Sequence, residues 1–364
     1  MVEPQLELTA LELERAQLAE RSFESMWRYA ELLPIEADAA VTMGEGATPL
    51  LDCPKIADEV GVDSFSLKIE GENPTGTFKD RGATLSISAA NALGVEEIAL
   101  SSAGNAGHAA AAYAARAGLK AHVFLPARAS FTMKAMVNVL GGDLTVVEGR
   151  LQDAGRAFKS ALEDHPEWHP VATDHTPFRR EGKKTMFYEV AEQRDWSVPD
   201  HIVYPTGGGV GLLGMFKAAN ELLELGWIDR LPAFHAAQST GCAPVVDAFN
   251  AGADDITPIE RPDTICGGIE VNAPGAGVEV LNVLRESGGQ AIATDDDAIL
   301  DAALSVAGLE GIGIAPTAAA GVSGAAALVD EGHISPDEDV VVIATGTGLK
   351  EPDVLRSQLM RHGI

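Results

Sequence analysis

From residue 65 onward, short apolar runs alternate along the chain with longer stretches whose small and apolar residues recur at helical spacing. The runs are rich in Val, Ile, Leu and Ala, and Gly, Pro or charged residues border them, which is typical of buried strands. Alanine-rich stretches between the runs, such as residues 106–117 and 215–225, are predicted to be helices. Strands that alternate with helices predict an α/β fold with an open, mostly parallel sheet. The predicted strands are residues 65–69, 98–101, 120–125, 143–147, 201–204, 233–238 and 340–343.

The same pattern predicts two domains. Residues 90–178 contain three of the predicted strands in a repeated αβ order, which indicates a smaller αβ domain inserted into a larger one. We therefore expect residues 1–89 and 179–364 to form the large domain. Apolar residues at roughly helical spacing predict one or two helices before residue 34. The uncharged run 311–329 contains Gly, Pro, Thr and Ser, and so predicts a turn and a buried helix rather than a membrane span.

The strongly acidic composition of the chain excludes one class of binding partner. The chain has 54 acidic and 26 basic residues and a formal net charge of −28. Nucleic acids require a basic surface, so they are excluded as partners. Because the acidic excess is spread over the whole chain, it indicates a halophilic source with a high-salt cytoplasm, in which ions screen the self-repulsion.

The three cysteines, Cys53, Cys242 and Cys266, are isolated, and no CxxC motif occurs. This number and spacing support neither a disulfide framework nor a zinc site. The N-terminus lacks the basic start and the apolar core of a signal peptide. We therefore expect a cytoplasmic protein that binds neither a metal nor a membrane.

The segment around which the chain is organised, residues 71–82, reads GENPTGTFKDRG. Its Pro and Gly residues end the preceding strand, because Pro has a fixed φ and no amide donor and Gly favours a turn. Lys79 is thus presented where a strand leads into a helix expected from about residue 83. Beside Phe78 and near positive potential its ammonium form is disfavoured, which leaves the free amine that condenses with an aldehyde cofactor. Taken alone, the segment fits a surface lysine paired with Asp80 equally well.

Two further small-residue segments follow predicted strands and open predicted helices. Residues 101–107, SSAGNAG, present helix N-terminal amides to an anion such as a carboxylate, and Asn105 adds a neutral hydrogen-bonding group. An ordinary helix-capping loop fits this segment as well. Residues 205–211, PTGGGVG, present several amides to one anion and indicate a phosphate cradle.

The second of these segments also matches the dinucleotide fingerprint GxGxxG when it is read on to Gly214. A nicotinamide site requires an acidic residue at the end of the next strand, where it holds a ribose. That strand is predicted to end at Gln238, so a site for a single phosphate monoester is the better prediction.

The last predicted strand is followed by residues 344–349, ATGTGL. The hydroxyl of Thr345 could face a neutral ring nitrogen without protonating it, although the segment alone reads as a polar turn. Open α/β sheets bind ligands at the carboxyl ends of their parallel strands. Four small-residue loops at such positions therefore predict a shared binding site.

Residues 173–186 hold the densest basic cluster of the chain, formed by Arg179, Arg180, Lys183 and Lys184. Positive charge against an acidic background indicates an anionic substrate, and Arg can bind a phosphate with two donors. The alternative is pairing with neighbouring acids on a helix face.

Five motifs, NPTGTFKDRG, SAGNAG, EGKKTM, PTGGGVG and TGTGLK, occur here in the order found in threonine synthases. Over residues 44–352 the chain resembles that family, whose members are tryptophan-synthase-β-like, fold type II enzymes that use pyridoxal 5'-phosphate. The resemblance implies the two-domain fold of these enzymes and the conversion of O-phosphohomoserine and water to threonine and phosphate. It also implies an amino-acid substrate and a homodimer.

The resemblance further implies a role for individual residues. Lys79, with Phe78 beside it, would hold the cofactor aldehyde and shuttle protons, so it would be both a cofactor ligand and the catalytic residue. The other cofactor ligands would be Asn105 at the ring hydroxyl, Thr345 at the pyridine nitrogen, and the amides of Gly207, Gly208, Gly209, Val210 and Gly211 at the phosphate. The substrate would be bound by Ser102, Ala103, Gly104 and Ala106 at its carboxylate and by Arg179 and Lys183 at its phosphate.

Two departures from the family pattern keep alternatives open. Asp174 stands near where many members place a small polar phosphate ligand, and the acidic residue common in relatives is missing around residues 315–317. A threonine or serine dehydratase, which eliminates at Cβ and needs no substrate phosphate, would suit Asp174 better. A nicotinamide-dependent oxidoreductase and a non-catalytic amino-acid-binding protein on the same fold are the remaining alternatives.

Overall fold

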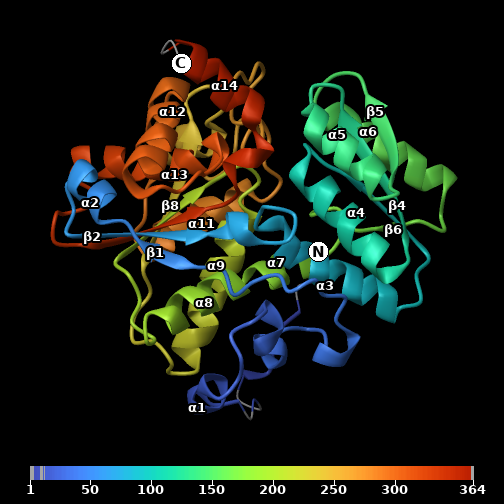
Figure 1. Ribbon diagram of the computed structural model, residues 1–364, viewed down its shortest axis with the longest axis horizontal. Helices are drawn as coiled ribbons and strands as arrows, with labels where there is room; N and C mark the ends of the chain where they lie inside the picture. The colour runs from blue at the N-terminus through green and yellow to red at the C-terminus, as the bar shows by residue number, and fades with distance from the viewer. Residues whose placement is uncertain (1–3, 9–10, 12, 362–364) are drawn as a thin grey trace. The chain divides into compact units, whose positions relative to one another are not determined.

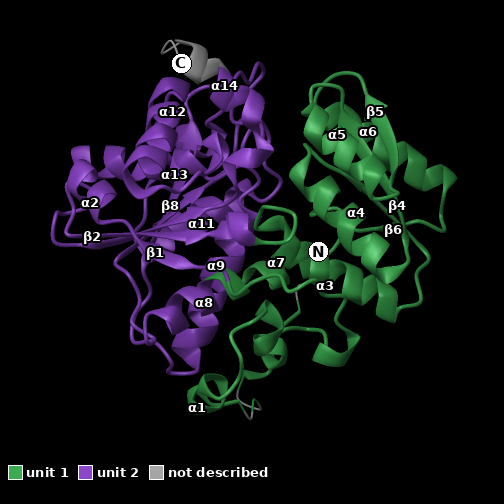
Figure 2. Ribbon diagram, in the orientation of Figure 1, with its two compact units in different colours: residues 1–47, 73–186 green, residues 48–72, 187–364 purple. Residues whose placement is uncertain are grey.

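The computed structural model describes residues 4–8, 11 and 13–361 (Figure 1). It divides into two compact units, which Figure 2 shows in different colours. Unit 1 comprises residues 1–47 and 73–186, and unit 2 comprises residues 48–72 and 187–364. Each unit has its own mostly or wholly parallel sheet with helices, so the predicted α/β class is confirmed.

Unit 2 is built on a six-stranded sheet with the order β1-β2-β10-β7-β8-β9. Only β1 is antiparallel to its neighbour, and the remaining pairs are parallel. The strands are β1 (Leu50–Asp52), β2 (Ser64–Ile69), β7 (His201–Pro205), β8 (Ala233–Ser239), β9 (Ala291–Thr294) and β10 (Asp339–Ala344). The helices are α2 (Pro54–Val60), α9 (Val210–Glu224), α10 (Pro244–Asn250), α11 (Gly277–Ser287), α12 (Asp296–Ser305), α13 (Pro316–Asp330) and α14 (Pro352–Arg361), with α8 (Thr185–Gln193) beginning at the border with unit 1.

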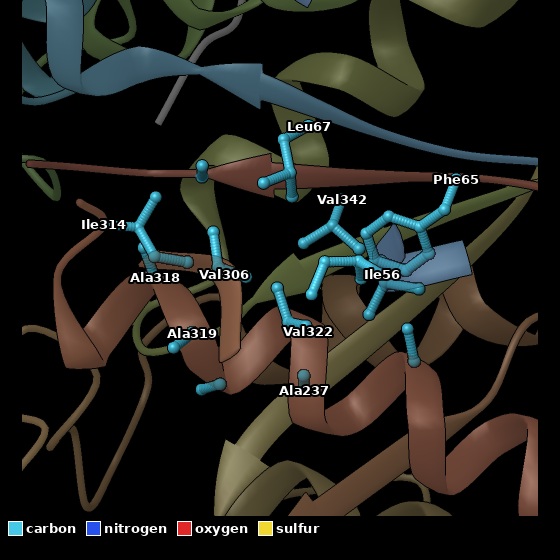
Figure 3. Close-up of a cluster of buried hydrophobic side chains, with 14 of the residues drawn as sticks. Ile56, Phe65, Leu67, Ala237, Val306, Ile314, Ala318, Ala319, Val322 and Val342 are labelled. Carbon is cyan, nitrogen blue, oxygen red and sulfur yellow. The ribbon is translucent and has the colours of Figure 1, made fainter. Parts of the chain in front are cut away.

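Helix α13 packs directly on this sheet and forms much of its core (Figure 3). Its small residues allow a close approach, because a Cβ at Gly321 would lie 2.7 Å from Val342 and one at Gly324 would lie 2.8 Å from Ala237. The prediction of a buried helix within 311–329 is therefore confirmed. Among the described residues, the helices do not combine the length and apolar character that crossing a bilayer requires.

Unit 1 carries a four-stranded parallel sheet with the order β5-β4-β3-β6. Its strands are β3 (Glu97–Ser101), β4 (Lys120–Pro126), β5 (Asp143–Val147) and β6 (His169–Pro170). Its α-helices are α1 (Arg15–Ala19), α3 (Lys79–Ala92), α4 (Asn105–Ala117), α5 (Phe131–Val139), α6 (Leu151–Asp164) and α7 (Phe178–Lys183).

All seven predicted strands are present, and three strands are found that were not predicted: β1, β6 and β9. Strands β1 and β6 have only three and two residues, too few for a periodic signal. The predicted N-terminal helices reduce to the short α1 and a 3₁₀ segment, Met26–Leu32, while residues 1–3, 9–10 and 12 lie outside the described part of the chain.

The unit boundaries differ from the predicted domains 1–89 with 179–364 and 90–178. Residues 1–47, 73–89 and 179–186 belong with the smaller sheet rather than with the larger one. The reason is that α3 packs against both α4 and α7 of unit 1, a contact that the order of strands and helices along the chain does not reveal.

Candidate active site

Lys79 is the first residue of α3, earlier than the helix start near residue 83 that we expected. Asp80 fixes the loop before it. The Asp80 carboxylate accepts two hydrogen bonds from Thr75, one from the amide at 2.6 Å and one from the side-chain hydroxyl at 2.5 Å. Gly76 adopts φ +79°, a conformation that favours glycine. Asp80 thus holds the loop, and no ion pair of Lys79 with a carboxylate occurs in the described part of the chain.

The surroundings of the Lys79 amine are apolar and positive. Its Nζ lies 4.0 Å from the centroid of the Phe78 ring, and Nζ of Lys183 lies 5.4 Å from the same ring. Burial lowers the pKa of Lys79 to about 7, and the positive charge of Arg179 contributes to the same shift. Burial and the charges of Lys79, Arg179 and Arg180 hold the pKa of Lys183 well below its usual value. A deprotonated amine is thus accessible near neutral pH.

Two glycines bring the helices that carry these cations together. A Cβ on Gly82 of α3 would lie 2.8 Å from the carbonyl oxygen of Arg179, and a Cβ on Gly182 of α7 would lie 1.9 Å from the carbonyl oxygen of Arg81. The buried Arg81 also donates from Nη1 to the hydroxyl of Thr185 at 3.0 Å. Backbone packs on backbone here, and this packing sets where Arg179 and Lys183 lie relative to Lys79.

Replacing Gly182 with Ala is expected to lower the free energy of unfolding by about 3 kcal/mol, because the new methyl group has to displace backbone rather than a flexible side chain. Gly155 in α6 is the matched control, since a Cβ there would have only the Ser101 hydroxyl nearby, at 3.9 Å. Gly155→Ala should leave stability unchanged or raise it by up to about 1 kcal/mol. Denaturant unfolding of both variants measures the difference, and equal effects would contradict this explanation of the packing.

Arg179 is 1% exposed, and Nη1 donates to the carbonyl oxygen of Val171 at 3.0 Å. Its Nε and Nη2 are buried without a hydrogen-bond partner among the described residues. Burial lowers its pKa to about 10, so the guanidinium remains charged at neutral pH. Unpaired buried donors on a charged group are costly, and an anion would satisfy them.

The basic cluster therefore separates into two kinds of residue. Lys184 pairs with Glu181 at 2.9 Å and donates to the carbonyl oxygen of Leu32 at 2.9 Å, so its role is structural. Lys183 has no carboxylate partner in the described part of the chain. The side chain of Asp174 is 69% exposed and pairs with His175 at 2.9 Å.

The segment 101–107 joins the carboxyl end of β3 to the first turn of α4, as predicted. Its turn is held by Ser102, whose Oγ accepts from the amides of Gly104 at 3.0 Å and Gly107 at 2.9 Å. Gly104 adopts φ +149°, and a Cβ there would lie 2.8 Å from Met133. Asn105 Oδ1 is buried and without a partner among the described residues. Among the described residues, none accepts a hydrogen bond from the amides of Ala103, Asn105 and Ala106, so this loop presents unsatisfied polar groups.

In unit 2 the glycine-rich loop connects β7 to α9, and it is closely packed on one side. A Cβ at Gly207 would lie 3.0 Å from Ile269, and one at Gly211 would lie 1.9 Å from the Tyr204 hydroxyl. A Cβ at Gly208, in contrast, would meet nothing within 4 Å. In the described part of the chain, the amides of Gly207, Gly208 and Gly209 have no acceptor, and Val210 begins the helix. The loop is thus packed against protein at Gly207 and Gly211, is open at Gly208 and has amides without an acceptor among the described residues. These properties suit the binding of a phosphate.

Gln238 supports this loop and is a residue whose role we did not predict. It is fully buried in β8, and its Nε2 donates to the carbonyl oxygen of Thr206 at 2.9 Å. Its Oε1 accepts from the amides of Val245 and Val246 at 2.9 and 3.3 Å. Both ends of the side chain are thus engaged within the protein, where they hold the glycine-rich loop against the start of α10.

Thr345 follows β10, the strand beside β7 in the sheet, so it lies at the same edge as the glycine-rich loop. It is 5% exposed, and its hydroxyl makes no hydrogen bond to another described residue. The loop after β2 reaches the same edge, because a Cβ at Gly71 would lie 2.8 Å from the amide of Thr347. The predicted site residues therefore fall into two groups: unit 1 holds Lys79, Phe78, Ser102, Ala103, Gly104, Asn105, Ala106, Arg179 and Lys183, and unit 2 holds Gly207, Gly208, Gly209, Val210, Gly211 and Thr345.

Comparison with known proteins adds independent information. The sequence profile of the family described as pyridoxal-phosphate dependent enzyme matches residues 41–346. Threonine synthase from Methanosarcina acetivorans is 39% identical over 91% of this chain and 81% of its own length, and that from Methanocaldococcus jannaschii is 37% identical over 90% and 81%. Among solved structures, the L-serine ammonia-lyase of Rhizomucor miehei matches with a TM-score of 0.74 and 22% identity over 86% of this chain and 98% of that one, which shows a shared fold.

Proposed function

This chain belongs to the pyridoxal-phosphate dependent enzymes, and we propose that within this family it is a threonine synthase, which converts O-phosphohomoserine and water to threonine and phosphate. Relatives of that name share 37–39% of its residues over about nine-tenths of the chain. Groups in both units support binding of the cofactor, and Arg179 in unit 1 supports a phosphorylated substrate.

The described residues fit pyridoxal phosphate. The open cradle at Gly208 and the free amides beside it would hold the phosphate, and Lys79 would bind the aldehyde. Asn105 Oδ1 and the Thr345 hydroxyl, which have no hydrogen-bond partner among the described residues, would meet the ring hydroxyl and the ring nitrogen. When bound, the cofactor supplies an electron sink for negative charge that develops beside the amino group of the substrate.

The protein groups then bind, orient and move protons. The Lys79 amine would take the proton from Cα and return protons later in the reaction, which its lowered pKa permits at neutral pH. The loop 102–106 would hold the carboxylate through its free amides. Arg179 and Lys183 would hold the phosphate that leaves Cγ, before water adds at Cβ.

The observation that most favours a phosphorylated substrate is the lack of hydrogen-bond partners for buried nitrogen atoms of Arg179. Its two buried, unpaired nitrogen atoms belong to a guanidinium that is charged at neutral pH and has no carboxylate partner in the described part of the chain. Uncompensated buried charge is destabilising, so Arg179 favours an anionic group of the ligand besides the carboxylate that the loop 102–106 would hold. A dehydratase substrate has no such group, and the exposed Asp174 no longer argues for one.

The test is an end-point assay of purified protein with pyridoxal phosphate in concentrated KCl. O-phosphohomoserine and threonine are supplied separately, and phosphate, threonine and 2-oxobutanoate are measured. Equal amounts of phosphate and threonine from the first substrate are expected. Formation of 2-oxobutanoate from threonine, with O-phosphohomoserine untouched, would instead establish a dehydratase.

Cofactor capture is expected to accelerate as the pH rises to about 7 and then to level off, because only the free amine attacks an aldehyde and the pKa of Lys79 is about 7. Below that pH, the reactive fraction falls about tenfold per pH unit. Stopped-flow absorbance after mixing the apoprotein with pyridoxal phosphate gives the rate. Nα-acetyl-lysine serves as the control amine, and its rate should still rise well above pH 7. A protein profile that follows this control would contradict the lowered pKa.

The cellular setting is inferred from composition and family resemblance. We infer a homodimer that works in the cytoplasm of a halophilic cell, where salt screens the net charge of −28. Light scattering in molar KCl gives the mass of the assembly, and a monomer that is fully active would contradict the dimer.

A further inference from the structure

Glu351 lies just beyond the loop that carries Thr345 and contacts a separate segment of unit 2. Its carboxylate accepts hydrogen bonds from the Thr317 hydroxyl at 2.8 Å and from the Thr317 amide at 3.2 Å. Thr317 is the second residue of α13, so Glu351 also satisfies one of the free amides at the start of that helix. Burial raises the pKa of Glu351, and the bonds from Thr317 oppose this shift.

The Thr345 loop is joined to the segment before α13 at several points. The contact of Glu351 with Thr317 is the last of these along the chain. The amide of Ala315 donates to Gly346 at 3.0 Å, and the amide of Gly348 donates to Gly313 at 2.9 Å. An isolated β-bridge joins Ile314 to Thr347. Together these contacts make residues 313–317 and 345–351 one locally rigid piece.

This piece also reaches the glycine-rich loop. A Cβ at Gly268 would lie 2.7 Å from Thr317 Cγ2, and a Cβ at Gly207 would lie 3.2 Å from the Gly268 carbonyl oxygen. Thr317 therefore stands between the loop with Thr345 and the segment that supports Gly207. A shift of Thr317 would therefore displace both the Thr345 loop and the glycine-rich loop. The packing of Thr317 on Gly268 and of Gly268 on Gly207 leaves no space to absorb such a shift.

We propose that Glu351 is a positioning residue of the cofactor site: through Thr317, its carboxylate sets the spacing between the Thr345 loop and the glycine-rich loop. No assignment of Glu351 follows from the motifs, since it lies outside them. It also supplies a carboxylate next to residues 315–317, where the sequence has no acid of its own.

The test compares paired variants by cofactor affinity and by the visible circular dichroism of the bound cofactor, which reports how the ring is oriented. Glu351→Ala and Thr317→Val should each weaken pyridoxal phosphate binding about tenfold and change the dichroic band. Thr317→Ser keeps the hydroxyl and should behave as wild type. Glu351→Gln keeps one acceptor and should fall between wild type and Glu351→Ala. The double variant Glu351→Ala/Thr317→Val should be no worse than Glu351→Ala, because the two residues act through one contact.

Glu310 provides the matched control. Its carboxylate accepts from the amides of Lys55 and Ile56 at 2.8 and 3.1 Å and so caps α2 in the same unit, and it makes no hydrogen bond to either loop among the described residues. Glu310→Ala should lower the melting temperature and leave cofactor affinity and dichroism unchanged. The proposal is overturned if Glu351→Ala and Thr317→Val bind the cofactor as wild type does, or if Glu310→Ala alters the dichroic band to the same extent. Since the readout is cofactor binding, the result does not depend on whether the substrate is phosphorylated.

Discussion

Replacing Lys79 with Ala is expected to lower turnover of O-phosphohomoserine by at least about a thousandfold. The substitution removes both the amine that binds the cofactor aldehyde and the base with a pKa near 7, and general acid–base groups alone contribute about 10²- to 10⁴-fold. Phosphate release under saturating pyridoxal phosphate measures the loss. Borohydride treatment followed by peptide mass spectrometry should place the reduced cofactor on Lys79 in the wild-type protein.

Lys159→Ala is the control, because this lysine is exposed on α6 of the same unit. Its turnover and its borohydride labelling should match those of the wild type. If Lys79→Ala retained more than a tenth of the activity, or if another lysine carried the label, Lys79 would not be the catalytic amine.

Replacing Arg179 with Gln is expected to lower kcat/KM for O-phosphohomoserine about a hundredfold. Hydrogen bonds to charged groups contribute about 1.5–3 kcal/mol each, and Arg179 has two nitrogen atoms available for the substrate phosphate. The variant should also raise the pKa of Lys79, because the Arg179 charge is one cause of its lowering. The pH at which cofactor capture levels off should therefore move upward.

Arg179→Lys retains the charge without the two-pronged geometry, and its kcat/KM should lie between those of the wild type and Arg179→Gln. Arg156→Gln removes an exposed arginine of the same unit and should change kcat/KM less than about threefold. An Arg179→Gln variant with normal kcat/KM would mean that the phosphate is bound elsewhere or that the substrate has none.

Much of the architecture could be predicted because its signals are local. Each buried strand is a short apolar run, and each ligand loop is a cluster of small residues at the end of such a run. Lys79 could be singled out because a Pro-Thr-Gly turn is followed, after Thr77, by Phe78 and a lysine. These signals depend on residues within a few positions of one another.

The remaining features depend on contacts between distant residues. Lys184 and Arg179 look alike in the sequence, but Lys184 donates to Leu32, 152 positions away, while Arg179 keeps two free donors. The assignment of α3 to the smaller unit rests on its packing with α7, which Gly82 and Gly182 permit. Gln238 and Glu351 act on loops that lie far from them in the sequence, so no motif contains them.

In the proposed reaction, phosphate leaves Cγ by carbon–oxygen cleavage and water enters at Cβ. The most direct test is turnover of O-phosphohomoserine in ¹⁸O-labelled water, with mass spectrometry of both products. We expect threonine with the label in its hydroxyl group, together with an equal amount of unlabelled phosphate. Homoserine accompanied by labelled phosphate would show phosphorus–oxygen cleavage and would contradict the proposed reaction.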